Sequence, residues 1–152
     1  MQSRMNPYAA APEAMKAMME LEAKVQAQGL EQSLVNLVKV RASQINGCAF
    51  CLNMHTAEAR AAGEIEARLH LLNAWREAPC YSRRERAALA WTDALTRIAD
   101  THAPDEDYEL LREHFSDDER VKLTLAIVAI NGWNRFAISF RMVPDVKPPE
   151  AA

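Results

Sequence analysis

Cysteine and glycine are scarce in this sequence, and positive charges do not outnumber negative ones. Its 152 residues include three cysteines and four glycines, and its formal net charge is -3. A chain of this length buries enough apolar surface to fold without a framework of disulfides, so we expect one domain over residues 1–152. Because there is no basic field to attract phosphates, we expect no nucleic-acid partner.

Long apolar runs are also missing. The N-terminal stretch MQSRMNPYAAAPEAMKAMMELEAK carries charges throughout and does not resemble a secretory signal. The longest uncharged apolar run, residues 123–134, is too short to span a bilayer. We therefore expect a cytoplasmic protein that does not enter a membrane. In that reducing compartment, a close pair of cysteines is more often catalytic or metal-binding than structural.

No segment alternates apolar and polar residues in the way that a half-buried strand does. The predicted fold class is therefore all-α, a single-domain helical bundle of about six to seven helices. Prolines and glycines mark where helices begin and end. Together with the apolar spacing, they predict helices at residues 12–29, 32–43, 48–63 and 64–78.

Serines followed three positions later by glutamate predict two more helix starts, SRRE at residues 82–85 and SDDE at residues 116–119. A short helix is expected over residues 104–114, opened by a proline. The last helix, DERVKLTLAIVAINGWNRFAISFR, is apolar on nearly every side, which places it at the centre of the domain or between subunits. The proline-rich residues 143–152 are expected to form an extended tail.

Two of the three cysteines stand close together, in RASQINGCAFCLNMHTAEARAAG. On an α-helix, Cys48, Cys51 and His55 share one face. Asn46-Gly47 breaks the preceding helix, so Cys48 falls in a first turn, where free N–H groups and the helix dipole lower the pKa of a thiol. A thiolate, a base and a second thiol are what two-step thiol redox chemistry requires.

Two other interpretations of this cluster are possible. The cysteines can be small core residues and His55 a buried histidine with its hydrogen bonds satisfied. Alternatively, the three residues can bind zinc, but a structural zinc site needs a fourth ligand, usually from a second short cluster. The remaining histidines and cysteine stand singly, so we expect no metal site; they are His70, Cys80, His102 and His114. Cys80 follows a proline in a predicted loop and is expected to be a bystander.

The run LVNLVKVRASQINGCAFCLNMHTAEARAAG resembles the core signature of the alkylhydroperoxidase D-like, or carboxymuconolactone decarboxylase, family. The resemblance extends through HLLNAWREAPCYSRRERAALAWTDALT and LTLAIVAINGWNRFAISFR. It implies an all-helical fold that assembles into trimers or hexamers, and a peroxidase that reduces hydroperoxides without a cofactor. It further implies that Cys51 is the peroxidatic cysteine, that Cys48 is a more exposed resolving cysteine, and that His55 serves a proton relay. The implied electron donor is a dithiol protein, which bears lipoamide in the best-known members.

The sequence departs from the family pattern at two positions. The family relay usually includes a glutamate twelve residues before the first cysteine, where this chain has Asn36. An amide cannot take up a proton, although it can orient a water. Phe50 stands where some members have a histidine. Glu58 lies three residues after His55 and either holds the imidazole in one tautomer or belongs to a solvated acidic face.

Three functions remain open at this point. The first is a thiol-dependent peroxidase that uses Cys51, Cys48 and His55. The second is a thiol-disulfide reductase or a redox-sensing oligomer with little peroxidase activity. The third is a decarboxylase of a muconolactone-like acid, which the intact cysteine pair disfavours because such family members do not depend on it.

Overall fold

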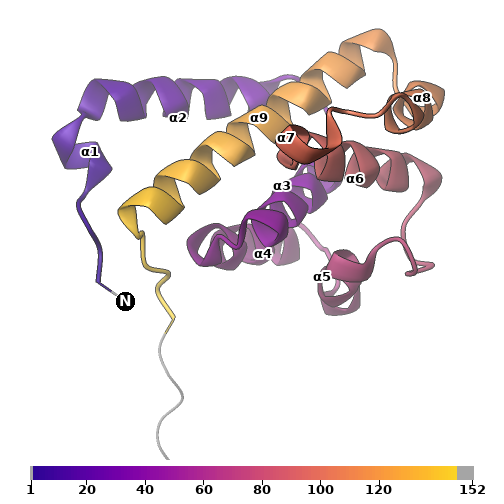
Figure 1. The fold of residues 1–152 in the computed structure, drawn as a ribbon. Coiled ribbons are helices and arrows are strands. Elements are labelled where there is room, and N and C mark those ends of the chain that lie inside the picture. Colours follow the sequence, from indigo (N-terminus) through magenta and orange to yellow (C-terminus); the bar gives the residue numbers. More distant parts are fainter. Residues whose placement is uncertain (1, 147–152) are drawn as a thin grey trace, which may run out of the picture.

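The computed structural model describes residues 2–146, which fold into a bundle of helices (Figure 1). Within these residues no strand is present, which confirms the all-α prediction. The elements are α1 (Pro7–Ala10), α2 (Pro12–Ala27), α3 (Gln32–Asn46), α4 (Ala49–Ala61), α5 (Glu66–Leu71), the 3-10 turn η1 (Leu72–Ala74), α6 (Arg83–Thr96), α7 (Ile98–Thr101), α8 (Asp105–His114) and α9 (Asp117–Phe140).

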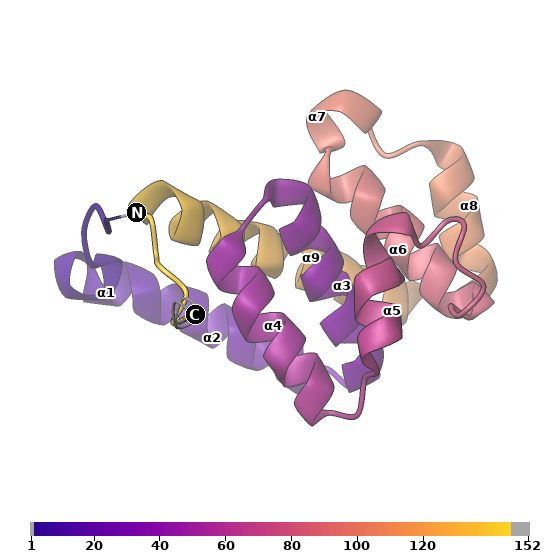
Figure 2. The same cartoon turned by 90° about the horizontal axis from the view of Figure 1, so that it is seen from below.

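Helix α3 lies at the centre of the bundle. Helices α4, α6 and α9 all pack against it, and α2 packs along α9 (Figures 1 and 2). Every residue from Leu34 to Ser43 is buried, including a lysine and an arginine. A helix that is buried on all sides needs neighbours on all sides, and the surrounding helices supply them.

Seven of the helices correspond to the predicted ones. Both predicted capping boxes are formed, with Ser82 and Ser116 each accepting from the backbone N–H three residues later. The two α-helices that the sequence did not predict, α1 and α7, are single turns of four residues. Such short elements depend on local caps, as at Asn6, whose side chain accepts from two backbone N–H groups of α1.

The helix predicted over residues 64–78 is shorter than expected. Only Glu66–Leu71 is α-helical, and a 3-10 turn follows it. The guanidinium of Arg86 donates to the backbone carbonyls of Trp75 and Ala78, at 2.9 and 3.0 Å, so these carbonyls bond a side chain and not a following turn. The indole of Trp75 turns into the core at the same point. Tertiary contacts therefore override the helical pattern here.

Helix α9 is the only helix among the described residues that is long and apolar enough, by length and composition alone, to cross a bilayer. It contains the run at residues 123–134 that was predicted to be too short for this. In the fold it packs along α2, α3 and α6, with Leu123, Ile127 and Ile130 buried. One side of the helix is thus buried in the core, whereas Val121 and Val128 on the same helix are 71% and 54% exposed, so a single chain does not cover it on all sides. Of the predicted tail, residues 143–146 form no helix, and residues 147–152 lie outside the described residues.

Gly47 connects the central helix to the helix that carries the cysteines. Its φ of +67° lies in the left-handed region, and it ends α3. Gly47→Ala is expected to lower the free energy of unfolding by about 1 kcal/mol, because a Cβ is disfavoured in this conformation. The expected loss of stability does not come from a steric clash, because a Cβ added at Gly47 has no other atom within 4 Å. Urea denaturation measures the loss, and Gly47→Asn, which tolerates this conformation better, is the control. A Gly47→Ala protein as stable as the wild type would contradict the argument.

Candidate active site

The two neighbouring cysteines meet at the start of α4. Gly47 turns the chain, and Cys48 becomes the N-cap residue of the helix. Its sulfur accepts a hydrogen bond from the backbone N–H of Cys51 at 3.2 Å. The two sulfurs form a disulfide, with Cα atoms 5.3 Å apart. The sequence therefore places two thiols where they can form and break one bond, and a helix N-terminus favours the thiolate of Cys48.

Both cysteines are buried in the chain. Cys48 is 1% exposed and Cys51 is 2% exposed. The expectation that Cys48 is the more exposed thiol is therefore wrong. The physical reason is that Ala137 of α9 packs against both sulfurs, while Phe50 and Met142 cover them. Access to either sulfur depends on the cavities beside it.

His55 is buried one turn after Cys51. Its Nδ1 lies 2.7 Å from a carboxylate oxygen of Glu58. Because a carboxylate can only accept, Nδ1 donates and Nε2 is left with a lone pair. Nε2 is buried and has no hydrogen-bond partner among the described residues. Burial lowers the pKa of His55 below its ordinary value, and the hydrogen bond to Glu58 offsets only part of this effect. A neutral imidazole with a free Nε2 is able to accept a proton.

Glu58 is half-exposed and still bonds the imidazole. The two alternatives for this residue thus both hold in part. Its carboxylate bonds Nδ1 of His55, and 52% of its side chain is exposed to solvent.

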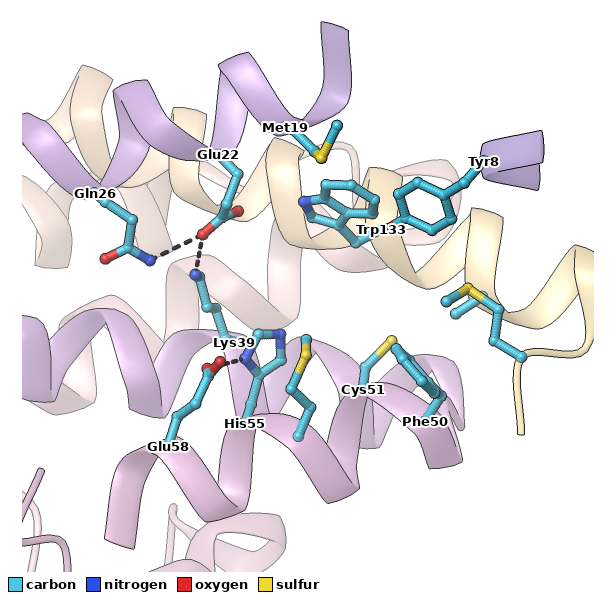
Figure 3. Close-up of a pocket in the computed structure, with 13 residues that line it drawn as sticks. Tyr8, Met19, Glu22, Gln26, Lys39, Phe50, Cys51, His55, Glu58 and Trp133 are labelled. Atoms are coloured by element: carbon cyan, nitrogen blue, oxygen red, sulfur yellow. Dashed lines mark hydrogen bonds and ion pairs between the residues drawn. The ribbon is translucent and has the colours of Figure 1, made fainter. Parts of the chain in front are cut away.

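Cys51 and His55 line one cavity of about 390 Å³ between α2, α4 and α9 (Figure 3). Among the described residues, no hydrogen bond joins His55 to either sulfur. Most of the lining is apolar or aromatic. The lining residues are Tyr8, Met19, Glu22, Gln26, Lys39, Phe50, Cys51, Met54, His55, Glu58, Trp133, Ala137 and Met142.

Two charged residues of this cavity escaped the sequence analysis. Lys39 is 2% exposed and forms an ion pair with Glu22, which also accepts from Gln26 at 2.9 Å. Burial raises the pKa of the Glu22 carboxyl, but the hydrogen bonds from Lys39 and Gln26 outweigh it, so this pKa lies below its ordinary value. A signal was present, since Lys39 stands between Val38 and Val40 in the most apolar part of α3.

The structure does not bring Asn36 into this cavity. Asn36 is buried, and its side-chain oxygen accepts from Gln32 at 2.8 Å. It lines a separate cavity together with Ala59 and Arg68. The charged groups that share the cavity with His55 are Glu58 on its own helix, Glu22 on α2 and Lys39 on the next turn of α3.

A second cavity, of about 510 Å³, lies on the Cys48 side of the disulfide. Phe50, Ala137 and Met142 line both cavities and form the wall between them. Cys51 lines only the first, and Cys48 only the second. The two cysteines of the disulfide therefore line different cavities, and these cavities share three apolar residues.

Among residues 2–146, no group of three or more His, Cys, Asp and Glu side chains is placed to hold a metal ion. Cys80 is a free, half-buried thiol. It packs at the edge of the core cluster around Leu69 and Trp75, away from the disulfide.

Comparison with known protein families assigns the chain that forms this site to one of them. The carboxymuconolactone decarboxylase family matches residues 12–94, which is more than half of the chain. The chain belongs to the carboxymuconolactone decarboxylase family. The match spans the disulfide and His55, and it confirms the resemblance seen in the sequence.

Three proteins similar to this member of the carboxymuconolactone decarboxylase family are informative. A crystal structure from Agrobacterium tumefaciens, of a protein of unknown function described as a candidate antioxidant defence protein AhpD, is 53% identical, with a TM-score of 0.94 over 96% of this chain and 100% of that chain. The uncharacterized protein YdfG of Bacillus subtilis is 43% identical over 139 residues, which are 91% of this chain and 95% of YdfG. The debrominase Bmp8 shares the fold at 18% identity, with a TM-score of 0.82 over 91% of this chain and 74% of its own.

Proposed function

We propose that the protein is a thiol-dependent peroxidase that reduces hydroperoxides through Cys51, Cys48 and His55. The observation that carries the proposal is the disulfide at the start of α4, whose Cys51 lines the same cavity as the free Nε2 of His55. The 53% identical relative described as a candidate antioxidant defence protein supports it. We place the protein in the cytoplasm, where dithiol donors can return the pair to its reduced state.

In the first step, Nε2 of His55 accepts the proton of the Cys51 thiol, directly or through a water. The Cys51 thiolate then attacks one peroxide oxygen, so that an S–O bond forms and the O–O bond breaks. The sulfur is oxidised by two electrons to a sulfenic acid, and the other oxygen leaves as an alkoxide. The imidazolium of His55 returns its proton to that oxygen, which leaves as an alcohol, or as water from hydrogen peroxide.

In the second step, Cys48 attacks the sulfenic acid of Cys51, and a disulfide and water are formed. The Cys51 N–H that points at the Cys48 sulfur stabilises the attacking thiolate. The closeness of the two Cα atoms means that the disulfide closes without a large movement of the helix.

In the third step, one thiol of an external dithiol attacks the Cys48 sulfur from the second cavity, which forms a mixed disulfide and releases the Cys51 thiolate. The second thiol of the donor then attacks its own sulfur in this mixed disulfide, so that Cys48 is released as a thiol and the donor leaves as a disulfide. Arg4 and Arg141 line this cavity and suit a donor that carries negative charge nearby. A lipoamide-bearing protein is one donor of the required chemistry. The apolar lining of the first cavity, with Met19, Met54 and Trp133, suits hydroperoxides of organic molecules.

We further propose that the protein is a homo-oligomer, a trimer or a hexamer. Val121 and Val128 stand one heptad apart on α9 and are 71% and 54% exposed, which leaves an apolar stripe for another subunit. Light scattering of the purified protein measures the mass of the assembly, and a mass of 17.1 kDa, that of one chain, would contradict the proposal.

The experiment that tests the function counts thiols. The reduced protein has three thiols per chain, and one equivalent of an organic hydroperoxide is expected to remove two of them, with peptide mapping locating the disulfide at Cys48 and Cys51. A Cys80→Ser protein, which starts with two thiols, is expected to lose both. Intact thiols after peroxide, combined with rapid exchange with a dithiol donor, would instead establish a reductase or sensor. Because Bmp8 shares the fold, loss of bromide from a brominated pyrrole is measured in parallel and would favour dehalogenation.

His55→Gln is expected to slow the oxidation of Cys51 by about 10²- to 10⁴-fold, because a positioned general base is lost while the shape of the side chain is largely kept. In the wild type, the rate is expected to fall as the pH drops through the pKa of His55, which lies below its ordinary value. Stopped-flow rates between about pH 5 and about pH 9 measure both effects. His70→Gln, at an exposed histidine on α5, is the matched control. An unchanged pH profile in His55→Gln would show that another group is the base.

A further inference from the structure

Two unsatisfied polar atoms face the cavity of Cys51 from different helices. Among the described residues, Oε2 of Glu22 and Nε2 of His55 are buried without a hydrogen-bond partner. Such orphaned atoms are costly in a folded protein, so they mark a place where a hydrogen-bonding ligand binds. Both residues line the same cavity, Glu22 from α2 and His55 from α4 (Figure 3).

Lys39 completes the polar end of this cavity. A lysine is almost never fully buried unless it is paired, and Lys39 has Glu22 as its only partner among the described residues. An ammonium group has three hydrogens to donate, and this ion pair uses one of them. The remaining donors and the free oxygen of Glu22 offer both a donor and an acceptor to a hydroxyl group.

The charges around His55 come from three elements. Glu22 on α2 and Glu58 on α4 are negative, whereas Lys39 on α3 is positive, and α9 contributes only uncharged side chains to the cavity. The negative charges raise the pKa of His55, and Lys39 lowers it, with burial as the largest effect. The Glu22–Lys39 pair is therefore close enough to influence the base without contacting it.

We propose that Glu22 and Lys39 are positioning residues that complete the proton relay. Oε2 of Glu22 and Nε2 of His55 hold one hydroxylic group between them, a water or a substrate hydroxyl, and the opposite charges of the pair set how readily His55 takes a proton. This inference rests on the proposed function, because it assigns the pair to the relay of Cys51. It also explains how the site functions with Asn36 facing a different cavity.

Because Glu22 and Lys39 carry opposite charges, removing one or the other is expected to shift the pKa of His55 in opposite directions. In the disulfide form of the full chain, NMR titration of the His55 ring follows its pKa without any peroxidase assay. Glu22→Gln leaves the charge of Lys39 uncompensated and is expected to lower the pKa of His55, whereas Lys39→Met is expected to raise it, each on the order of one unit. The double variant is expected to titrate near the wild type. Glu20→Gln, at an exposed glutamate on the same helix, is the control.

Equal pKa values in all these proteins, or shifts of the same sign in the two single variants, would overturn the proposal. Each single variant leaves one buried charge unpaired and can fail to fold, which circular dichroism detects. In that case the test uses the double variant, which leaves no buried charge unpaired, and the quantity measured is its rate of Cys51 oxidation. We expect that rate to be about tenfold slower than in the wild type, and an unchanged rate would overturn the inference. If the wild type reacts with no hydroperoxide, the proposed peroxidase function is wrong. The NMR titration still tests whether Glu22 and Lys39 set the pKa of His55.

Discussion

Cys51→Ser is expected to abolish the reaction with hydroperoxides, by about 10³-fold or more, the order of loss that follows removal of a nucleophile. Cys48→Ser is expected to behave differently. It keeps the nucleophile and its base, so it reacts once at close to the wild-type rate and stops at the sulfenic acid of Cys51. Single-turnover kinetics measure the first step, and a sulfenic acid reagent such as dimedone traps the product for mass spectrometry.

The comparison of the two serine variants shows which cysteine attacks the peroxide and which resolves the sulfenic acid. Burial does not distinguish these roles, because both cysteines are buried to the same degree. The assignment depends on surroundings. Cys51 shares a cavity with His55, and Cys48 lines a different one. If Cys48→Ser lost the first step and Cys51→Ser kept it, the roles would be reversed.

Asp93→Asn is expected to lower the free energy of unfolding by about 3 to 5 kcal/mol, because it leaves the buried guanidinium of Arg41 without an anion. The Asp93 carboxylate accepts from Arg41 at 2.6 and 3.2 Å, and from the indole of Trp75 and the guanidinium of Arg76 at 3.3 Å each. One side chain of α6 thus holds α3 and the segment after η1 together.

Urea denaturation followed by circular dichroism measures this loss. Asp100→Asn, which removes the same charge at an exposed position on α7, is the matched control and is expected to change stability by less than about 0.5 kcal/mol. Equal stability of the two variants would show that the buried ion pair around Arg41 is replaceable.

The features that could be predicted from the sequence are those set by neighbouring residues. The two capping boxes, the helix end at Gly47 and the closeness of Cys48 to Cys51 depend on spacings of a few positions, and local backbone geometry fixes what such spacings do. The predicted face is shared only by Cys51 and His55, because Cys48 is the extended N-cap of α4 and lines a different cavity. The same reasoning predicted extensive burial of the apolar last helix, and Leu123, Ile127 and Ile130 are buried, whereas Val121 and Val128 stay exposed in one chain.

The features that could not be predicted depend on contacts between distant segments. Lys39 pairs with Glu22, seventeen positions earlier on another helix, and no local pattern couples the two. Arg86 captures the carbonyls after η1 and shortens a helix that the local sequence favours. Asn36 occupies the family's relay position in the chain, yet its side chain lies in a cavity of its own.

The wall formed by Phe50, Ala137 and Met142 has a consequence for how such a protein diversifies. In a thiol peroxidase with only one cavity, the oxidant and the electron donor would bind in the same place. Any substitution that admits a new oxidant would then also change the binding of the donor. Because Cys51 and Cys48 line different cavities, a substitution that lines only one cavity can change that cavity and leave the other unaltered. Under the proposed function, relatives that keep this wall can change the peroxide they accept and retain their electron donor.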